Sequence, residues 1–503
     1  MSVLTETAGL QAPRAKSAHR KGRALENVIR LFFGGNAFVA VVVLVLITLF
    51  LIREGFGFFG GNLQNLRSYR AAGLEYVDIM RTQAEAHAAL SRALSEVRVR
   101  EARKLAEQGR SLEEMNSALA GFDQFATSFS DAGNNLAGLV SDLGDQAIAL
   151  KERAATGEPA DVAALRSNYP AYEQISAATT VEINALLANP PQLSTPEAQR
   201  AFDKVKARMR TSLAEFPAEA QRLREWDPGR PVRWYESITS FLLGKEWITA
   251  SFWQDWYGVI PLLAGSVMVS VVALTLAVPF GVASAVYISE IATRPEQNLI
   301  KPYIEFIAAI PSVVLGFFGI AVLGQAIRAL SELPILSWVP FFPLSERLNV
   351  FTAGALLALM AVPTIFTLSE DALRNVPRAF KEASYALGAN RLQTIARVIV
   401  PSSLSGIVSA ILLGLGRVIG ETMVVLLCAG NRIAIPDFTE GLGAFFQPVH
   451  TMTGIIAQEM GEVVQGSIHY RALFMVGLVL FFLTLLINLA AQKISARYRM
   501  SIG

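Results

Sequence analysis

The stretch Glu382-Ala383-Ser384-Tyr385-Ala386-Leu387-Gly388, followed by Val398-Ile399-Val400-Pro401, decides how this chain is interpreted. Its spacing is Glu-Ala-Ala, three residues, Gly, nine residues, Ile-x-Leu-Pro, with conservative changes at three positions. Gly388 can take the left-handed conformation that ends a helix, so we expect one helix over 372–387 and a second, basic helix over 391–400. Taken alone, the stretch also fits an ordinary amphipathic helix with a glycine cap and a helix-stopping proline.

This spacing resembles the cytoplasmic coupling loop of ABC importer permeases, in which a short helix-turn-helix docks into a groove on the ATPase subunit. The resemblance implies a coupling loop at about 370–401. Residues expected at the ATPase contact are Lys381, Glu382, Ala383, Ser384, Gly388 and Pro401. The small side chains of Ala383 and Ser384 would let another protein surface come close.

The composition is that of a membrane protein with one soluble insert. The 503 residues are 52% hydrophobic and 17% charged, and the mean hydropathy is +0.40. A formal net charge of +2 does not favour nucleic-acid binding. The single cysteine, Cys428, excludes an internal disulfide, and the scattered histidines form no ligand-spaced pair, so we expect no metal site.

Six segments are long and apolar enough to cross a bilayer, which takes about 20 residues. They cover roughly 31–52, 260–288, 303–330, 351–368, 404–429 and 472–491. The first is too long for a signal peptide and lacks a small-residue cleavage site, so we interpret it as an uncleaved anchor. The predicted fold is all-α, with six transmembrane helices and a large extracytoplasmic helical insert between the first two.

Basic residues predict the orientation. The tail over residues 1–30 carries Arg14, Lys16, Arg20, Lys21, Arg23 and Arg30. Under the positive-inside rule this tail is cytoplasmic. Six crossings then return the carboxyl terminus, with Lys493, Arg497 and Arg499, to the same side. The basic loop after the fourth span also falls inside. We therefore expect a multi-pass protein of the bacterial inner membrane with both termini in the cytoplasm.

The insert at 53–257 is rich in helix-forming residues, and we expect three to five helices packed as a small bundle. An apolar stripe is expected at Leu90, Leu94, Val97, Val99, Leu105, Leu112, Met115 and Leu119. No motif indicates what the insert does. Aromatic residues crowd the segment 247–257, just before the second span, and we interpret them as an interfacial belt that anchors a helix.

From Gly258 to the end, the chain resembles phosphate importer permeases of the PstC type. The motifs are Gly265-Ser266, Ala309-Ile310-Pro311-Ser312, Ala361-Val362-Pro363-Thr364, Gly416-Arg417-Val418-Ile419-Gly420-Glu421-Thr422-Met423 and His469-Tyr470-Arg471. The resemblance implies a pore shared with a PstA-like permease, a PstB-like ATPase dimer and a periplasmic phosphate-binding protein. The insert departs from this family, which has little between its first two spans.

Charges inside the bilayer are the candidates for contact with the transported solute. Arg417 and Glu421 are four residues apart, so within one helix they would share a face. Because buried charges are costly in lipid, we expect them to face each other or a water-filled path. On such a path Arg417 would bind an oxyanion, and Glu421 would hold the Arg417 side chain in place. Thr422, Ser312 and Thr364 are weaker candidates; the last two follow prolines and can satisfy freed carbonyls instead.

The chain contains no phosphate-binding Gly-x-x-x-x-Gly-Lys-Ser/Thr loop, so we expect a transporter subunit rather than an enzyme, with no cofactor of its own and ATP bound by the partner ATPase. Two alternatives stay open. The solute is another oxyanion (sulfate, molybdate or phosphonate), because an Arg–Glu pair does not separate these; or the chain is a membrane-anchored sensor with a periplasmic helical bundle.

Overall fold

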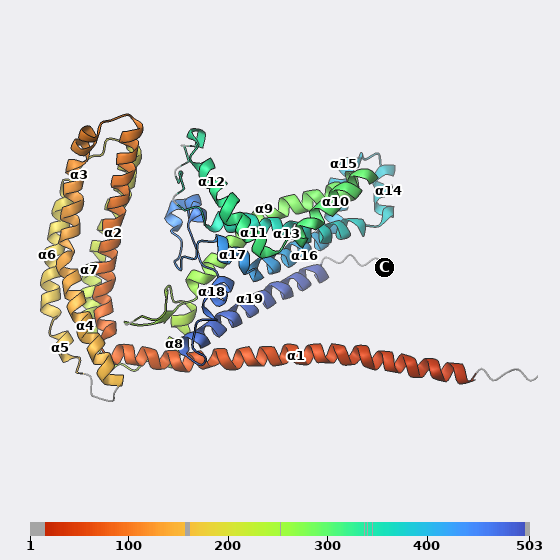
Figure 1. Ribbon diagram of the computed structural model, residues 1–503, viewed down its shortest axis with the longest axis horizontal. Coiled ribbons are helices and arrows are strands. Elements are labelled where there is room, and N and C mark those ends of the chain that lie inside the picture. The colour runs from red at the N-terminus through yellow and green to blue at the C-terminus, as the bar shows by residue number, and fades with distance from the viewer. Residues whose placement is uncertain are drawn as a thin grey trace, which may run out of the picture.

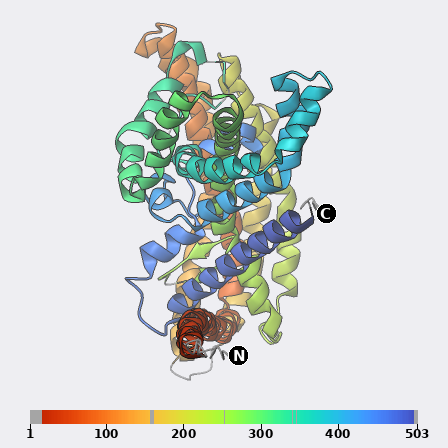
Figure 2. The same cartoon turned by 90° about the vertical axis from the view of Figure 1, so that its right-hand side faces the viewer.

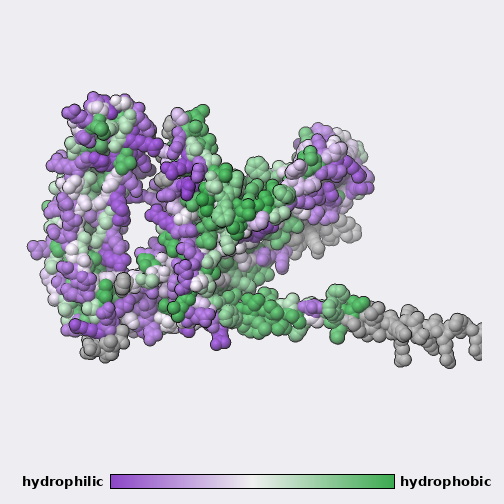
Figure 3. Space-filling model, viewed as in Figure 1, coloured by the Kyte–Doolittle hydropathy of each residue, from purple (hydrophilic) through white to green (hydrophobic). Residues whose placement is uncertain are grey.

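The computed structural model describes residues 16–155, 161–251, 253–336, 338–339, 341–344 and 346–497. These residues form a long first helix, a polar helical bundle and a compact group of apolar helices (Figure 1). Hydrophobic side chains gather over the compact group and along α1, whereas hydrophilic ones cover the bundle and the opposite tip of the molecule (Figure 3). This distribution is the one expected where a bilayer surrounds the middle of the protein.

Helix α1 (Lys16–Ala71) is one continuous helix of 56 residues. Its side chains over 31–50 are almost all exposed and, apart from Asn36 and Thr48, apolar, so they form a surface for lipid. Beyond the predicted span at 31–52 the helix continues and packs on α19, with Gly55 against Met475 and Gly57 against Arg471. Figure 2 shows α1 end-on at one edge of the molecule, next to α19.

Most of the insert is a helical bundle. Its helices are α2 (Leu74–Glu107), α3 (Leu112–Ala132), α4 (Asn134–Ala155), α5 (Ala163–Arg166), α6 (Tyr169–Ala188) and α7 (Pro196–Glu225). These six exceed the three to five expected, because a break at Gly133 separates α3 from α4 and the single turn α5 precedes α6. Gly157-Glu158-Pro159 predicts a further break between helices, and these residues lie outside the described ones.

The core of the bundle confirms most of the predicted stripe. Leu90, Leu94, Val97, Leu105 and Leu119 are buried, whereas Val99 and Leu112 are exposed. The start of α7 is fixed to α2: Glu101 of α2 accepts hydrogen bonds from the backbone N–H groups of Ser194 (2.8 Å) and Thr195 (3.2 Å), just before α7 begins. Halfway along α7, Arg208 contacts Asp437 (2.5 Å) and Thr439 (3.0 Å) of the apolar group.

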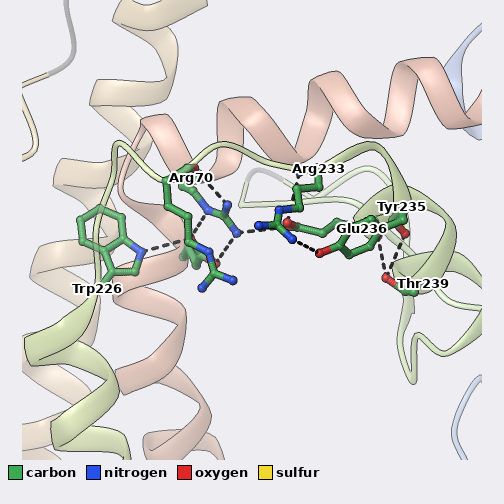
Figure 4. Close-up of polar contacts among 8 residues, drawn as sticks. Arg70, Trp226, Arg233, Tyr235, Glu236 and Thr239 are labelled. Carbon is green, nitrogen blue, oxygen red and sulfur yellow. Dashed lines mark hydrogen bonds and ion pairs between the residues drawn. The ribbon is translucent and has the colours of Figure 1, made fainter.

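The base of the bundle is joined to α1 by a polar network. Gly73, with φ of 75°, separates α1 from α2. Across this turn Arg70 pairs with Glu75 (2.7 Å) and, from the other side, with Glu236 (3.3 Å), while the indole of Trp226 donates to Glu75 (3.1 Å) (Figure 4). Glu236 belongs to α8 (Trp234–Leu242), so this network connects three helices at the point where the chain leaves and re-enters the membrane part.

The aromatic residues at 247–257 do not form the predicted interfacial belt. Trp247 and Tyr257 oppose each other in the two-stranded sheet of β1 (Trp247–Ile248) and β2 (Trp256–Tyr257), and both are buried. Trp253 lies under Arg81 of α2, and its carbonyl accepts a hydrogen bond from Lys151 (2.8 Å). The segment therefore packs between the bundle and the membrane helices and is not free to lie in the membrane interface. Phe252 lies outside the described residues.

The apolar group is built around α9 (Ile260–Val286) and α13 (Val350–Arg374), which pack along their lengths. Its other helical elements are the π-helical segment Tyr287–Ile291, α10 (Arg294–Ala309), α11 (Ser312–Phe318), the π-helical segment Gly319–Leu323, α12 (Gly324–Ser331), the 3₁₀ turn Pro334–Leu336, α14 (Arg378–Ala386), α15 (Arg391–Thr394), the π-helical segment Ile395–Ile399, α16 (Val400–Gly420), α17 (Met423–Cys428), the 3₁₀ segment Phe438–Phe446, α18 (Met452–Glu459) and α19 (Ile468–Arg497). Close approach of α13 to α9 requires Gly354, where a Cβ would lie 2.6 Å from Val272.

The described residues contain six helices long and apolar enough to cross a membrane, which confirms the predicted number. Two predicted spans were placed wrongly. The third begins at Ser312 and not near 303, because α10 ends at Ala309 and Pro311 lacks the N–H that would continue it. The fifth covers 391–420 and not 404–429, because α16 ends at Gly420 and the backbone of Glu421 is extended.

Candidate functional site

Helices α13 and α16 bring a cation and a hydroxyl together at the surface of the apolar group. Arg417 lies in the last turn of α16, and its Nη1 donates a hydrogen bond to Oγ1 of Thr364 on α13 (3.2 Å). Gly414, one turn earlier on α16, lies against Ile365, and a Cβ there would come within 2.8 Å of it. The missing side chain at 414 therefore lets α16 approach α13 closely enough for the contact.

Arg417 keeps most of its hydrogen-bonding capacity. Its side chain is exposed, and it forms no salt bridge with any of the described residues. A guanidinium has five N–H donors in a planar fork, and the bond to Thr364 uses one of them. The remaining donors can bind an oxyanion in the two-point geometry that carboxylates and phosphates share.

Glu421 does not share a helix face with Arg417, so this expectation is wrong. Residues four apart face each other only inside a helix, and α16 ends one residue before Glu421. Its Oε1 accepts a hydrogen bond from the N–H of Met423 (3.2 Å), and its carbonyl accepts one from Thr453 (2.9 Å). Glu421 therefore holds the start of α17 and cannot be the intrahelical partner of Arg417.

The other two predicted residues lie at helix starts. Thr422 directly precedes α17, and its carbonyl accepts from the N–H of Leu426 (3.0 Å). Ser312 is the first residue of α11, which packs on α17 where Cys428 contacts the carbonyl of Gly316 (3.3 Å). Across the described part of the chain, no hydrogen bond joins Ser312 to Arg417 or Thr364.

The coupling loop has the two predicted helices, and each differs from its predicted extent. The first helix is not continuous over 372–387: α13 ends at Arg374, and α14 begins at Arg378, after Pro377. Gly388 has φ of 80°, as its predicted role as a helix end requires, and the N–H of Ala389 bonds the carbonyl of Ser384 (3.2 Å).

The second helix continues through Pro401. α15, the π-helical segment 395–399 and α16 follow one another without a break, so Pro401 is the second residue of α16 and does not end a helix. Pro401 itself is exposed. The extra residue of a π-helical turn accommodates a position whose backbone has no N–H to donate.

The surface of the loop divides into fixed and free side chains. Lys381 pairs with Glu290 at the end of the second membrane span (2.6 Å), and Ser384 bonds Thr394 of α15 (2.9 Å). Glu382 and Ala383 are exposed, and Leu387 is 89% exposed. Ser384 therefore connects the two helices of the loop, and the residues open to another protein are its neighbours.

A buried acid below the loop was not recognised from the sequence. Glu370 on α13 is buried and pairs with Lys301 of α10 (3.0 Å) and Arg374 (2.7 Å). The four-residue spacing to Arg374 is a signal that sequence reasoning can use. The pairing with Lys301 depends on how α10 packs and has no such signal. Glu305 pairs at 4.0 Å with the same lysine, within its own helix.

The carboxyl-terminal half of the chain matches known transport proteins. A family model described as "Binding-protein-dependent transport system inner membrane component" matches residues 277–500. A probable ABC transporter permease of Bacillus subtilis is 34% identical over 52% of this chain and 82% of its own length. The chain belongs to this family of inner-membrane permeases.

Further family members include proteins named phosphate transport system permease protein PstC. The one from Haemophilus influenzae is 31% identical over 54% of this chain and 86% of its own length. Among solved structures, one of a methionine ABC transporter is 20% identical, covers 48% of this chain and 94% of that chain, and has a TM-score of 0.34. A likeness at this score carries no weight for function. Family membership makes the chain a multi-pass inner-membrane subunit of an ABC importer.

Proposed function

We propose that this permease subunit transports phosphate. The observation that carries the proposal is its similarity, over most of their length, to permeases named for phosphate transport. The available donors of Arg417 support it, because a guanidinium fork suits a tetrahedral oxyanion. Thr364 would orient the guanidinium, which takes over the positioning role that the sequence suggested for Glu421.

The partners in this proposal follow from the family pattern. A PstA-like permease would complete the pore, a PstB-like ATPase dimer would bind ATP, and a periplasmic phosphate-binding protein would deliver the solute. Both termini would be cytoplasmic and the bundle periplasmic. The exposed side chains of Glu382 and Ala383 would meet the ATPase, and the pair of Lys381 with Glu290 would carry its movement to the membrane helices.

Labelled-phosphate uptake tests the proposal. The complete operon is expressed in a host without its own phosphate transport, with membrane levels matched by immunoblot. Wild type is compared with Arg417→Ala, with Arg417→Lys, and with Arg210→Ala as a control, since Arg210 is exposed on α7 of the bundle. We expect uptake that resists excess sulfate, is abolished by Arg417→Ala, is partly kept by Arg417→Lys and is unchanged by the control.

Other outcomes reject the proposal in distinct ways. Uptake that sulfate, molybdate or phosphonate competes away would assign the permease to another oxyanion. Absence of uptake in a fully assembled complex, together with a phosphate-dependent signal to a cytoplasmic effector, would favour a sensor. Uptake that survives Arg417→Ala would keep phosphate as the solute but remove Arg417 from its path.

A further inference from the structure

The exposed face of helix α8 is apolar. Trp234, Ile238 and Leu242 follow one another at four-residue spacing, so they share one side of the helix. Trp234 is 71% exposed and Leu242 43% exposed, and Leu243 directly after the helix is 68% exposed. The inward side is formed by Ser237 and Phe241, both fully buried. A water-facing helix has the opposite pattern, with its polar side outward.

Contacts of the inward side place α8 beside α1. The side-chain N–H of Asn62 donates to Ser237 and Ser240 of α8 (3.2 and 3.0 Å), and the hydroxyl of Ser237 donates to the carbonyl of Phe59 (2.9 Å). The ring of Phe58 packs on Phe241, with centroids 5.2 Å apart. α8 is therefore fixed against the part of α1 that directly follows its lipid-exposed stretch.

The same level of the molecule holds the first turns of two other candidate spans. The carbonyl of Phe241 accepts a hydrogen bond from the N–H of Val259 (2.9 Å), one residue before α9. Gly57 of α1 lies at Arg471 in the first turn of α19, which donates to its carbonyl (3.4 Å). Because α9 and α19 enter the membrane there, α8 lies at the boundary between the bilayer and the water on the bundle side.

We propose that the outward face of α8 is seated in the phospholipid headgroup layer on the bundle side of the membrane. Lipid is the occupant that the surroundings favour, because Phe59 of α1, which contacts Phe241 of α8, also contacts Phe56, an exposed apolar residue that follows the lipid-exposed stretch of α1. Trp234 and Tyr235 suit this depth, since amphipathic aromatics concentrate at the interface. Arg233 and Lys245 flank the helix and can direct their charges toward lipid phosphates.

This position of α8 connects the membrane surface to the base of the bundle. Glu236 of α8 pairs with Arg70, which also pairs with Glu75 at the first turn of α2 (Figure 4). A helix held by lipid would fix this network and with it the direction in which the bundle leaves α1. The inference is independent of the identity of the transported solute.

Nitroxide accessibility in lipid nanodiscs tests the inference on the full chain assembled with its partners. Cys428 is replaced by alanine, and single cysteines are introduced as Leu242→Cys, as Trp234→Cys and, as a control, as Val181→Cys, since Val181 is an equally apolar and 69% exposed residue of the bundle helix α6. After spin labelling, collision rates with oxygen, which concentrates in lipid, and with a water-soluble nickel chelate are compared.

We expect oxygen to be favoured over nickel at 242 and 234, and the reverse at 181. Nickel-dominated accessibility at 242 and 234, equal to that at 181, would place α8 in water and overturn the inference. Exclusion of both reagents with a strongly immobilised label would place a protein partner on the face and would overturn it equally. Two labelled positions keep the test decisive if one variant does not assemble.

Discussion

Arg417 of α16 and Thr364 of α13, 53 positions apart, are joined by a hydrogen bond of 3.2 Å between Nη1 and Oγ1. The threonine follows Pro363, and in the structure its hydroxyl faces the neighbouring helix. The contact fixes the direction of a guanidinium whose remaining donors are available. Thr364 therefore orients the Arg417 guanidinium. This differs from the role that its position after Pro363 suggested, which was to satisfy a freed backbone carbonyl.

Replacing Thr364 by valine should slow solute uptake without abolishing it. A hydrogen bond to a charged group contributes about 1.5–3 kcal/mol, so loss of orientation should reduce the initial uptake rate by roughly 10-fold or more. Thr275→Val is the matched control, because that hydroxyl bonds Val271 of its own helix (2.7 Å). Equal rates for the two variants at equal membrane levels would deny Thr364 a positioning role.

The pair of Lys381 and Glu290 should show energetic coupling. Both side chains are largely enclosed, at 24% and 10% exposed. Lys381→Glu and Glu290→Lys should each lower ATP-driven uptake, and the double exchange should restore part of it. Contacting residues typically couple by about 0.5–3 kcal/mol, measurable as a double-mutant cycle on uptake rates. Purely additive losses would show that the pair does not transmit movement.

Glu370 should matter much more for stability than Glu305, although both approach Lys301. Removing Glu370 with alanine takes away a buried side chain and leaves Lys301 and Arg374, which are 33% and 49% exposed, without their shared partner, a change that costs about 1.5–3 kcal/mol. Glu305 is half exposed, so Glu305→Ala should cost at most about 1 kcal/mol. Thermal unfolding of the detergent-purified complex compares the two; similar midpoints would contradict a buried structural role for Glu370.

The bundle should lose stability in acid through His87. Its ring stacks on Phe129 and bonds that residue's carbonyl (2.7 Å), and burial lowers the pKa of this histidine. The unfolded chain takes up a proton near pH 6.5 while the folded chain does not, so stability falls as the pH drops below about 6.5, by at most about 1.4 kcal/mol for each pH unit.

His87→Gln keeps a donor for Phe129 and removes this titration. Limited proteolysis of the bundle in the intact protein, at pH 7.5 and 5.5, should therefore show a smaller acid effect in the variant than in wild type. Asp78 and Glu246 change stability in the opposite direction, since burial raises the pKa of each carboxyl, but they are common to both proteins. An unchanged acid effect would exclude His87 as its source.

The bundle should be removable with uptake retained. The structure favours a cut after Ala71, which keeps Asn62 and Asn65 on their partners. The two ends are close, because Arg70 contacts the carbonyl of Arg230 (3.2 Å). A variant with a short linker in place of 72–229 should assemble and transport; loss of uptake with normal assembly would show that the bundle is required.

The local signals of this chain predicted local structure well. The glycine at 388, the six apolar segments and the apolar stripe of the bundle were readable because helix ends and helix faces depend on nearby residues. Two span boundaries were misplaced where hydropathy runs across a break. Pro311 was a visible stop signal there, whereas the end of α16 at Gly420 had no equally strong one.

The sequence by itself determined the family, the coupling motif, the number of membrane helices and the helical nature of the insert, since these depend on spacing and hydropathy along the chain. Only the tertiary structure decided that Arg417 meets Thr364, that Glu421 holds α17, that Lys301 pairs with Glu370, and that α8 and not the segment 247–257 exposes apolar residues. These outcomes depend on how helices far apart in sequence pack against each other, and packing selects partners by geometry that no local pattern contains.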